Sequence, residues 1–109
     1  MNYQNKQFVI DTLMKLADSS PVKKTYPSSI YNSARNSYDI SQHELDIWVN
    51  YVNSVLDILS SYINQTELSL IKLQIRNIAS QNELTSAMRA LNIERELLNL
   101  AQNILRYYQ

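Results

Sequence analysis

Apolar positions in the first part of the chain recur at steps of three and four, which is the period of an α-helix. Residues 5–18 carry this pattern, and its apolar face comprises Val9, Leu13 and Leu16. The helix is expected to end at Ser20, because Pro21 disfavours helical backbone at the residue before it. Residues 19–29 contain two prolines and five Ser or Thr residues and show no periodic face, so they are predicted to form a loop.

A short helix is predicted after this loop. Pro27 suits the first position of a helix, since the N–H that proline lacks would have no helical partner there. Ile30 or Tyr31, together with Ala34 and Tyr38, would then lie on one side of the helix.

The next helix has a capping signal at its start. Ser41 and Glu44 have the spacing of a capping box, and Ile40 and Leu45 flank it as a hydrophobic staple. The stripe that follows comprises Leu45, Trp48, Val52, Val55, Leu59 and Tyr62. This pattern predicts a helix over residues 42–63.

Another helix is predicted from Asn64, whose side chain can cap it, with Glu67 three positions further on. Its apolar face comprises Leu68, Ile71, Ile75 and Ile78. Leu70 and Leu73 lie off that face, so we expect this helix to be buried on more than one side.

The last predicted helix is the longest and covers residues 81–107. Ser80 and Glu83 form a second capping-box pattern at its start. One apolar stripe comprises Leu84, Ala87, Leu91, Leu98, Ala101, Leu105 and Tyr108, and Glu94 interrupts it. A second stripe and the terminal tyrosines are the predicted homodimer interface: Ile93, Leu97, Leu100, Ile104, Tyr107 and Tyr108. Two stripes imply two contacts, such as the core on one side and a second subunit on the other.

These elements predict an all-α fold in a single domain, residues 1–109, with a long C-terminal helix. We expect a small bundle of about four to five helices. The predicted connections near residues 64 and 80 are short, so neighbouring helices should be mostly antiparallel.

Composition excludes several kinds of chemistry. The 109 residues include no Gly, no Cys and one His. Phosphate-binding loops, dinucleotide-binding turns and nucleophile elbows all depend on Gly. Zinc fingers and thiol nucleophiles need Cys or several His. We therefore expect no enzyme activity, no cofactor and no metal.

The charge balance bears on partners. The chain carries 10 Lys and Arg against 10 Asp and Glu, for a net charge of 0. This neutrality argues against a bulk electrostatic nucleic-acid binder. Residues 1–7 are polar and no long apolar run is present, so we expect a cytoplasmic protein with no signal peptide and no membrane span.

Two residues could have either a functional or a purely structural role. His43 could act as a general base beside Glu44, but we favour an exposed residue in the first turn of a helix. Trp48 could anchor an interface, but we favour a place in the core, because its neighbours at three and four residues are apolar.

The carboxylates of the last predicted helix could form a paired acidic site. Glu94 and Glu96 would point about 200° apart on a helix, so they cannot share a proton or a metal. We therefore interpret Glu83, Glu94 and Glu96 as surface charge near the cationic Arg89 and Arg95. Glu94 could instead set the register between helices.

The most suggestive segment is residues 22–38, where basic and aromatic residues alternate without an acid. Its predicted partner-binding residues are Lys23, Lys24, Tyr26, Tyr31, Arg35 and Tyr38. Such a set suits stacking on single-stranded nucleic acid, or a protein hot spot. The alternative is a solvated loop followed by a helix whose tyrosines pack at the core edge.

We expect a non-enzymatic protein-binding module, a small regulator or inhibitor of a larger protein. The partner's identity is open. The amino-acid usage is that of AT-rich codons, typical of low-GC bacteria and their phages, which suggests an anti-defence or immunity type of protein. The alternatives are a nucleic-acid-binding accessory protein that uses residues 22–38 and a subunit of a structural oligomer.

Overall fold

The computed structural model describes residues 3–25 and 39–107, and these residues form five α-helices and one 3-10 turn, without a strand. The elements are α1 (Tyr3–Asp18), α2 (Pro21–Thr25), α4 (Gln42–Ile58), the 3-10 turn η1 (Leu59–Ser61), α5 (Gln65–Ala79) and α6 (Ser86–Tyr107). The predicted all-α bundle with a long C-terminal helix is therefore confirmed. The short helix predicted after Pro27 lies outside the described residues.

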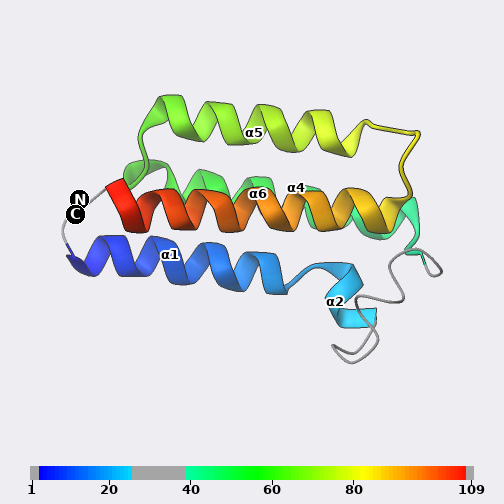
Figure 1. The fold of residues 1–109 in the computed structure, drawn as a ribbon, viewed down its shortest axis with the longest axis horizontal. Helices are drawn as coiled ribbons and strands as arrows, with labels where there is room; N and C mark the ends of the chain where they lie inside the picture. The colour runs from blue at the N-terminus through cyan, green and yellow to red at the C-terminus, as the bar shows by residue number, and fades with distance from the viewer. Residues whose placement is uncertain (1–2, 26–38, 108–109) are drawn as a thin grey trace.

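Helix α6 organises the bundle. It lies between α1 and α5 and runs antiparallel to both, while α4 lies behind it (Figure 1). The four long helices alternate in direction along the chain, and the connections from α4 to α5 and from α5 to α6 are short, as expected for antiparallel neighbours. Close backbone packing joins α6 to α1 and to α5, whereas α1 and α4 lie further apart.

Two of the predicted helix starts are confirmed by their caps. The Ser41 hydroxyl oxygen accepts the backbone N–H of Glu44 at 3.0 Å, and the Asn64 side-chain oxygen accepts that of Thr66 at 2.8 Å. Both bonds satisfy amides that the helix itself leaves without partners. Helix α4 ends earlier than predicted, because residues 59–61 tighten into the 3-10 turn.

The predicted start of the last helix is wrong. Helix α6 begins at Ser86, where the Thr85 hydroxyl oxygen accepts the backbone N–H of Met88 at 3.1 Å. Ser80 instead closes α5, because its hydroxyl donates to the carbonyl oxygen of Asn77 at 3.0 Å. A serine at a helix boundary can thus serve the helix before it as well as the one after it.

The prediction that residues 19–29 form one loop is also wrong, because Pro21–Thr25 is the short helix α2. Pro21 takes the first helical position, where its missing N–H costs nothing. The hydroxyl oxygen of Ser20 accepts the backbone N–H of Lys23 at 3.4 Å, and Val22 is buried.

The second stripe of α6 faces the chain's own core. Ile93, Leu97, Leu100 and Ile104 are all buried. They line the side of α6 that meets its neighbouring helices, so a partner could reach them only if the bundle opened. These four residues of the predicted dimer interface are therefore covered by the chain itself and are not an exposed surface for a second subunit. The exposed apolar residues of α6 are instead Leu98 and Leu105, from the first stripe.

Helix α5 is buried on one face. Leu68, Ile71 and Ile75 join the core, while Leu70 and Leu73 are exposed. The expectation that this helix is buried on more than one side is therefore wrong. Leu73 lies off the side of the helix that packs on α4 and α6, and Leu70 lies at its edge, where it lines a groove against α6.

Candidate functional site

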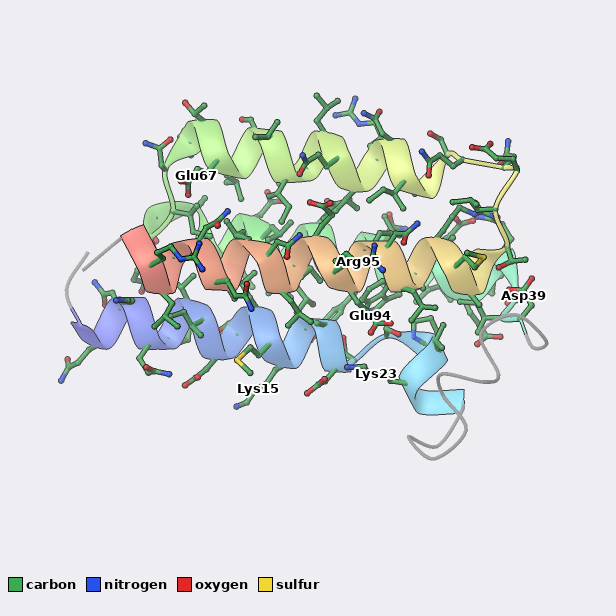
Figure 2. The ribbon with its side chains drawn as sticks, viewed as in Figure 1. Lys15, Lys23, Asp39, Glu67, Glu94 and Arg95 are labelled. Carbon is green, nitrogen blue, oxygen red and sulfur yellow. The ribbon has the colours of Figure 1, made fainter. Side chains whose placement is uncertain are left out.

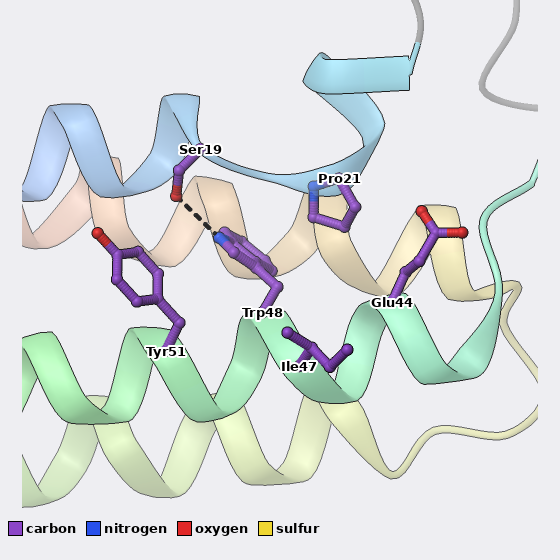
Figure 3. Close-up of a pocket in the computed structure, with 6 residues that line it drawn as sticks. All are labelled: Ser19, Pro21, Glu44, Ile47, Trp48 and Tyr51. Carbon is purple, nitrogen blue, oxygen red and sulfur yellow. Dashed lines mark hydrogen bonds between the residues drawn. The ribbon is translucent and has the colours of Figure 1, made fainter.

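A groove of about 280 Å³ separates the α1–α2 turn from α4 (Figure 3). We call it the α1–α4 groove, and its lining residues are Ser19, Pro21, Glu44, Ile47, Trp48 and Tyr51. Four of these six residues come from α4, and most of the lining surface is apolar.

Trp48 connects this groove to the core. Its side chain is 5 % exposed, and its indole N–H donates to the hydroxyl oxygen of Ser19 at 3.0 Å. A buried Trp has one polar atom to satisfy, and Ser19 supplies the acceptor. The prediction that Trp48 lies in the core is confirmed.

Ile47 and Tyr51 form the outer wall of the groove. They lie one turn apart on α4, and they are 56 % and 53 % exposed. In Figure 3 both side chains stand on the side of α4 that faces the α1–α2 turn. Large side chains held open beside a buried Trp form an apolar surface already shaped before any ligand arrives.

Three consecutive residues fix the opposite wall. Ser19 binds Trp48 of α4, and the hydroxyl of Ser20 donates to a carboxylate oxygen of Glu94 in α6 at 2.7 Å. Pro21, the next residue, lines the groove. The α1–α2 turn is therefore anchored to two other helices at once.

Glu94 is buried, with 5 % of its surface exposed, so its predicted role as surface charge is wrong. The amino group of Lys23 lies 3.7 Å from one of its carboxylate oxygens and 2.8 Å from Asp18 (Figure 2). The hydrogen bond that Lys23 donates to Asp18 raises the pKa of Lys23, and the charge of Glu94 adds to this against an opposing effect of burial. A buried carboxylate is tolerable here because a hydroxyl and an ammonium group meet it.

Arg89, one of the cations named near these carboxylates, is buried as well. Its guanidinium donates to the carbonyl oxygen of Ala79 at 2.7 Å and to the side-chain oxygen of Gln42 at 2.8 Å. Close by, the Asp39 carboxylate accepts the backbone N–H of Ala87 at 2.8 Å, at the first turn of α6. These bonds join the ends of α4, α5 and α6, which is a structural role.

A second groove, of about 340 Å³, lies between α5 and α6. We call it the α5–α6 groove, and its lining residues are Glu67, Leu70, Ile71, Gln74, Glu96, Asn99, Leu100 and Asn103. Figure 2 shows Glu67 on the side of α5 that faces α6. One oxygen of the Glu67 carboxylate is buried and has no hydrogen-bond partner among the described residues.

The predicted partner-binding residues are only partly described. Lys23 is engaged by Asp18 and Glu94, which leaves it less available to a phosphate. For each other member of that set, either the whole residue or its side chain lies outside the described part of the chain. These members are Lys24, Tyr26, Tyr31, Arg35 and Tyr38. The same holds for Tyr107 and Tyr108 of the predicted dimer interface.

His43 is exposed, as expected. Within residues 3–25 and 39–107, no group of three or more His, Cys, Asp or Glu side chains could hold a metal ion. None of the helices in this part of the chain is long and apolar enough to cross a membrane.

Sequence reasoning missed Ile47 and Tyr51. Both lie off the stripe that places Leu45, Trp48 and Val52 in the core. A large apolar side chain outside the core stripe of a well-predicted helix was the signal available in the sequence.

Comparison with protein family models, with curated protein sequences and with solved structures gives no match for this chain.

Proposed function

We propose that this chain is a non-enzymatic protein-binding module, a small regulator or inhibitor of a larger protein, and that it binds through the α1–α4 groove. The observation that carries the proposal is the exposure of Ile47 and Tyr51 next to the buried Trp48. Aromatic and apolar side chains around a pocket are the usual anchors of protein interfaces.

The way the groove is built supports the same function. Ser19 is hydrogen-bonded to Trp48, and Ser20 is hydrogen-bonded to Glu94. Both walls of the groove are therefore fixed to the helix bundle. A rigid binding surface loses little conformational entropy on association. Burying Ile47 and Tyr51 under a partner would remove apolar surface from water, at roughly 25 cal/mol per Å².

The test compares proteins recovered from a bacterial lysate by the immobilised wild type and by single variants. Ile47→Ser and Tyr51→Ser alter the groove. Leu105→Ser is the matched control, because Leu105 and Ile47 are both 56 % exposed and Leu105 lies outside the groove. We expect one protein that binds the wild type and Leu105→Ser but not the two groove variants.

Recovery of the same proteins by all four baits would contradict the proposal. Far-UV circular dichroism of each bait confirms that it is folded. Oligonucleotide binding that weakens steeply with salt and that survives Tyr51→Ser would favour the competing nucleic-acid function instead.

A further inference from the structure

We infer that the occupant of the α1–α4 groove is an amphipathic helix of a partner protein, with an apolar face and a Lys or Arg beside Glu44. This inference rests on the proposed function and specifies the chemistry of the partner. Three observations carry it: the length of the groove face, the kind of backbone that fits between two helices, and the charge of α4.

The apolar face extends beyond the groove itself. Along α4, Ile58 continues the exposed side that begins with Ile47 and Tyr51. Two side-chain contacts join the walls: the bond from Trp48 to Ser19, and the edge-on packing of Phe8 against Tyr62 with ring centroids 5.5 Å apart.

The exposed face of α4 sets a length for the occupant. Its ends, Glu44 and Ile58, are fourteen positions apart within the helix, which corresponds to about 21 Å at the rise of an α-helix. The groove covers the first part of this face, from Glu44 to Tyr51. A partner helix of about four turns would match this face.

A helix fits this exposed face better than an extended strand does. An added strand needs the open edge of a sheet, and the described residues contain no strand. A helix satisfies its own backbone hydrogen bonds and contributes only side chains, which can interdigitate with those of α4. Ile47, Tyr51 and Ile58 are spaced by four and seven residues, so they lie on one face of α4.

Charge selects the partner. Glu44 is the one charged residue lining the groove, and α4 contains Glu44, Asp46 and Asp57 but no Lys or Arg. A second copy that presented its own α4 would bring carboxylates toward carboxylates, which is unfavourable. A partner with a Lys or Arg near Glu44 would form an ion pair at the rim, which favours correct register and partner choice.

The test is a selection from a displayed library of 16-residue peptides with randomised positions. Peptides are selected on the wild type and counter-selected on Tyr51→Ser. We expect enriched peptides to carry apolar residues at positions i, i+3 or i+4, and i+7, with a Lys or Arg at one end. Their affinity should fall by at least about tenfold in Ile47→Ser and Tyr51→Ser and stay unchanged in Leu105→Ser.

Glu44→Gln tests the charge separately. The amide keeps an acceptor oxygen near Ser41, so the helix cap is retained while the negative charge is lost. Selection on this variant should still enrich the apolar pattern but should lose the preference for Lys or Arg.

Three results would overturn the inference: no enrichment over the counter-selected variant, enriched peptides with Pro or with alternating apolar residues, or a preference for acidic residues. Self-association in light scattering that disappears in Tyr51→Ser would also overturn it, since a second copy would then be the occupant. If a lysate protein still depends on Ile47 in the earlier experiment, the proposed function stands while the helical occupant fails.

Discussion

The two grooves of this protein are similar in volume and differ in how polar their walls are. The α1–α4 groove measures about 280 Å³ and presents Ile47, Trp48 and Tyr51 with one carboxylate, whereas the α5–α6 groove measures about 340 Å³ and combines apolar side chains with two carboxylates and three carboxamides. Water leaves an apolar surface with a gain in free energy. Carboxylates and carboxamides add to this gain only if the ligand replaces the hydrogen bonds of the displaced water. Volume alone is therefore a poor guide to which groove would bind a ligand.

The grooves also differ in how they are held. The α1–α4 groove rests on a buried Trp and on a turn bonded to two helices. In the α5–α6 groove, Glu67 has a buried oxygen without a partner in the described part of the chain. The buried polar groups beside the α1–α4 groove thus have hydrogen-bond partners. The α5–α6 groove contains a carboxylate oxygen whose burial costs free energy.

The largest predicted effect is the loss of Trp48. Trp48→Ala should destabilise the protein by about 3–5 kcal/mol, because it empties a core position and removes the bond to Ser19. Equilibrium urea unfolding followed by circular dichroism measures this change. Tyr51→Ala, on the same wall but exposed, should cost less than about 1 kcal/mol. Equal costs for the two variants would show that the groove is not built on the core.

The next effect distinguishes two carboxylates of α6: Glu94, which holds the α1–α2 turn, and Glu96, which lines the α5–α6 groove. Glu94→Ala should cost about 1–3 kcal/mol, since it leaves the buried Ser20 hydroxyl without its acceptor. Glu96→Ala, in the α5–α6 groove, should change stability by about 0.5 kcal/mol or less. The same urea titration serves for both, and a reversed order would contradict the assignment of Glu94 to the frame of the protein.

A smaller effect is predicted at the start of α6. Thr85→Ala should cost about 1 kcal/mol, as expected for the loss of an N-terminal cap. Ser80→Ala should cost less, since its hydroxyl only supplements a carbonyl at the end of α5. Thermal unfolding of the two variants gives the comparison, and a larger loss for Ser80→Ala would place the helix start at the residue favoured by the sequence.

The smallest predicted effect is a pH dependence from Lys23 of α2. Its pKa is raised above the ordinary value of 10.5, chiefly by the hydrogen bond that it donates to Asp18, so its contribution to stability is fully present below that value. The contribution is lost as the pH rises through the higher pKa of the folded state. The difference in unfolding free energy between wild type and Lys23→Met should therefore shrink above pH 10.5. A difference that grows with pH would contradict this sign.

Local signals predicted the local structure well. The caps at Ser41 and Asn64 depend on residues two or three positions away, and both are confirmed. The start of α6 was missed because the Ser80 pattern looks the same whether it begins a helix or ends one. The partner of Glu94 is 74 positions away along the chain, so no local pattern could identify it.

The residues of the α1–α4 groove could be predicted only in part from the sequence. The apolar stripe placed Trp48 correctly in the core. Whether Ile47 and Tyr51 are covered depends on how far α1 lies from α4, which is decided by the packing of both helices on α6. Periodicity within one helix contains no information on that distance.

The chain has a single tryptophan, and that residue lines the α1–α4 groove. The protein therefore carries a built-in optical reporter at the place where we propose that it binds. Its emission comes from the groove alone, so a titration can be followed in the unlabelled wild type by exciting one indole.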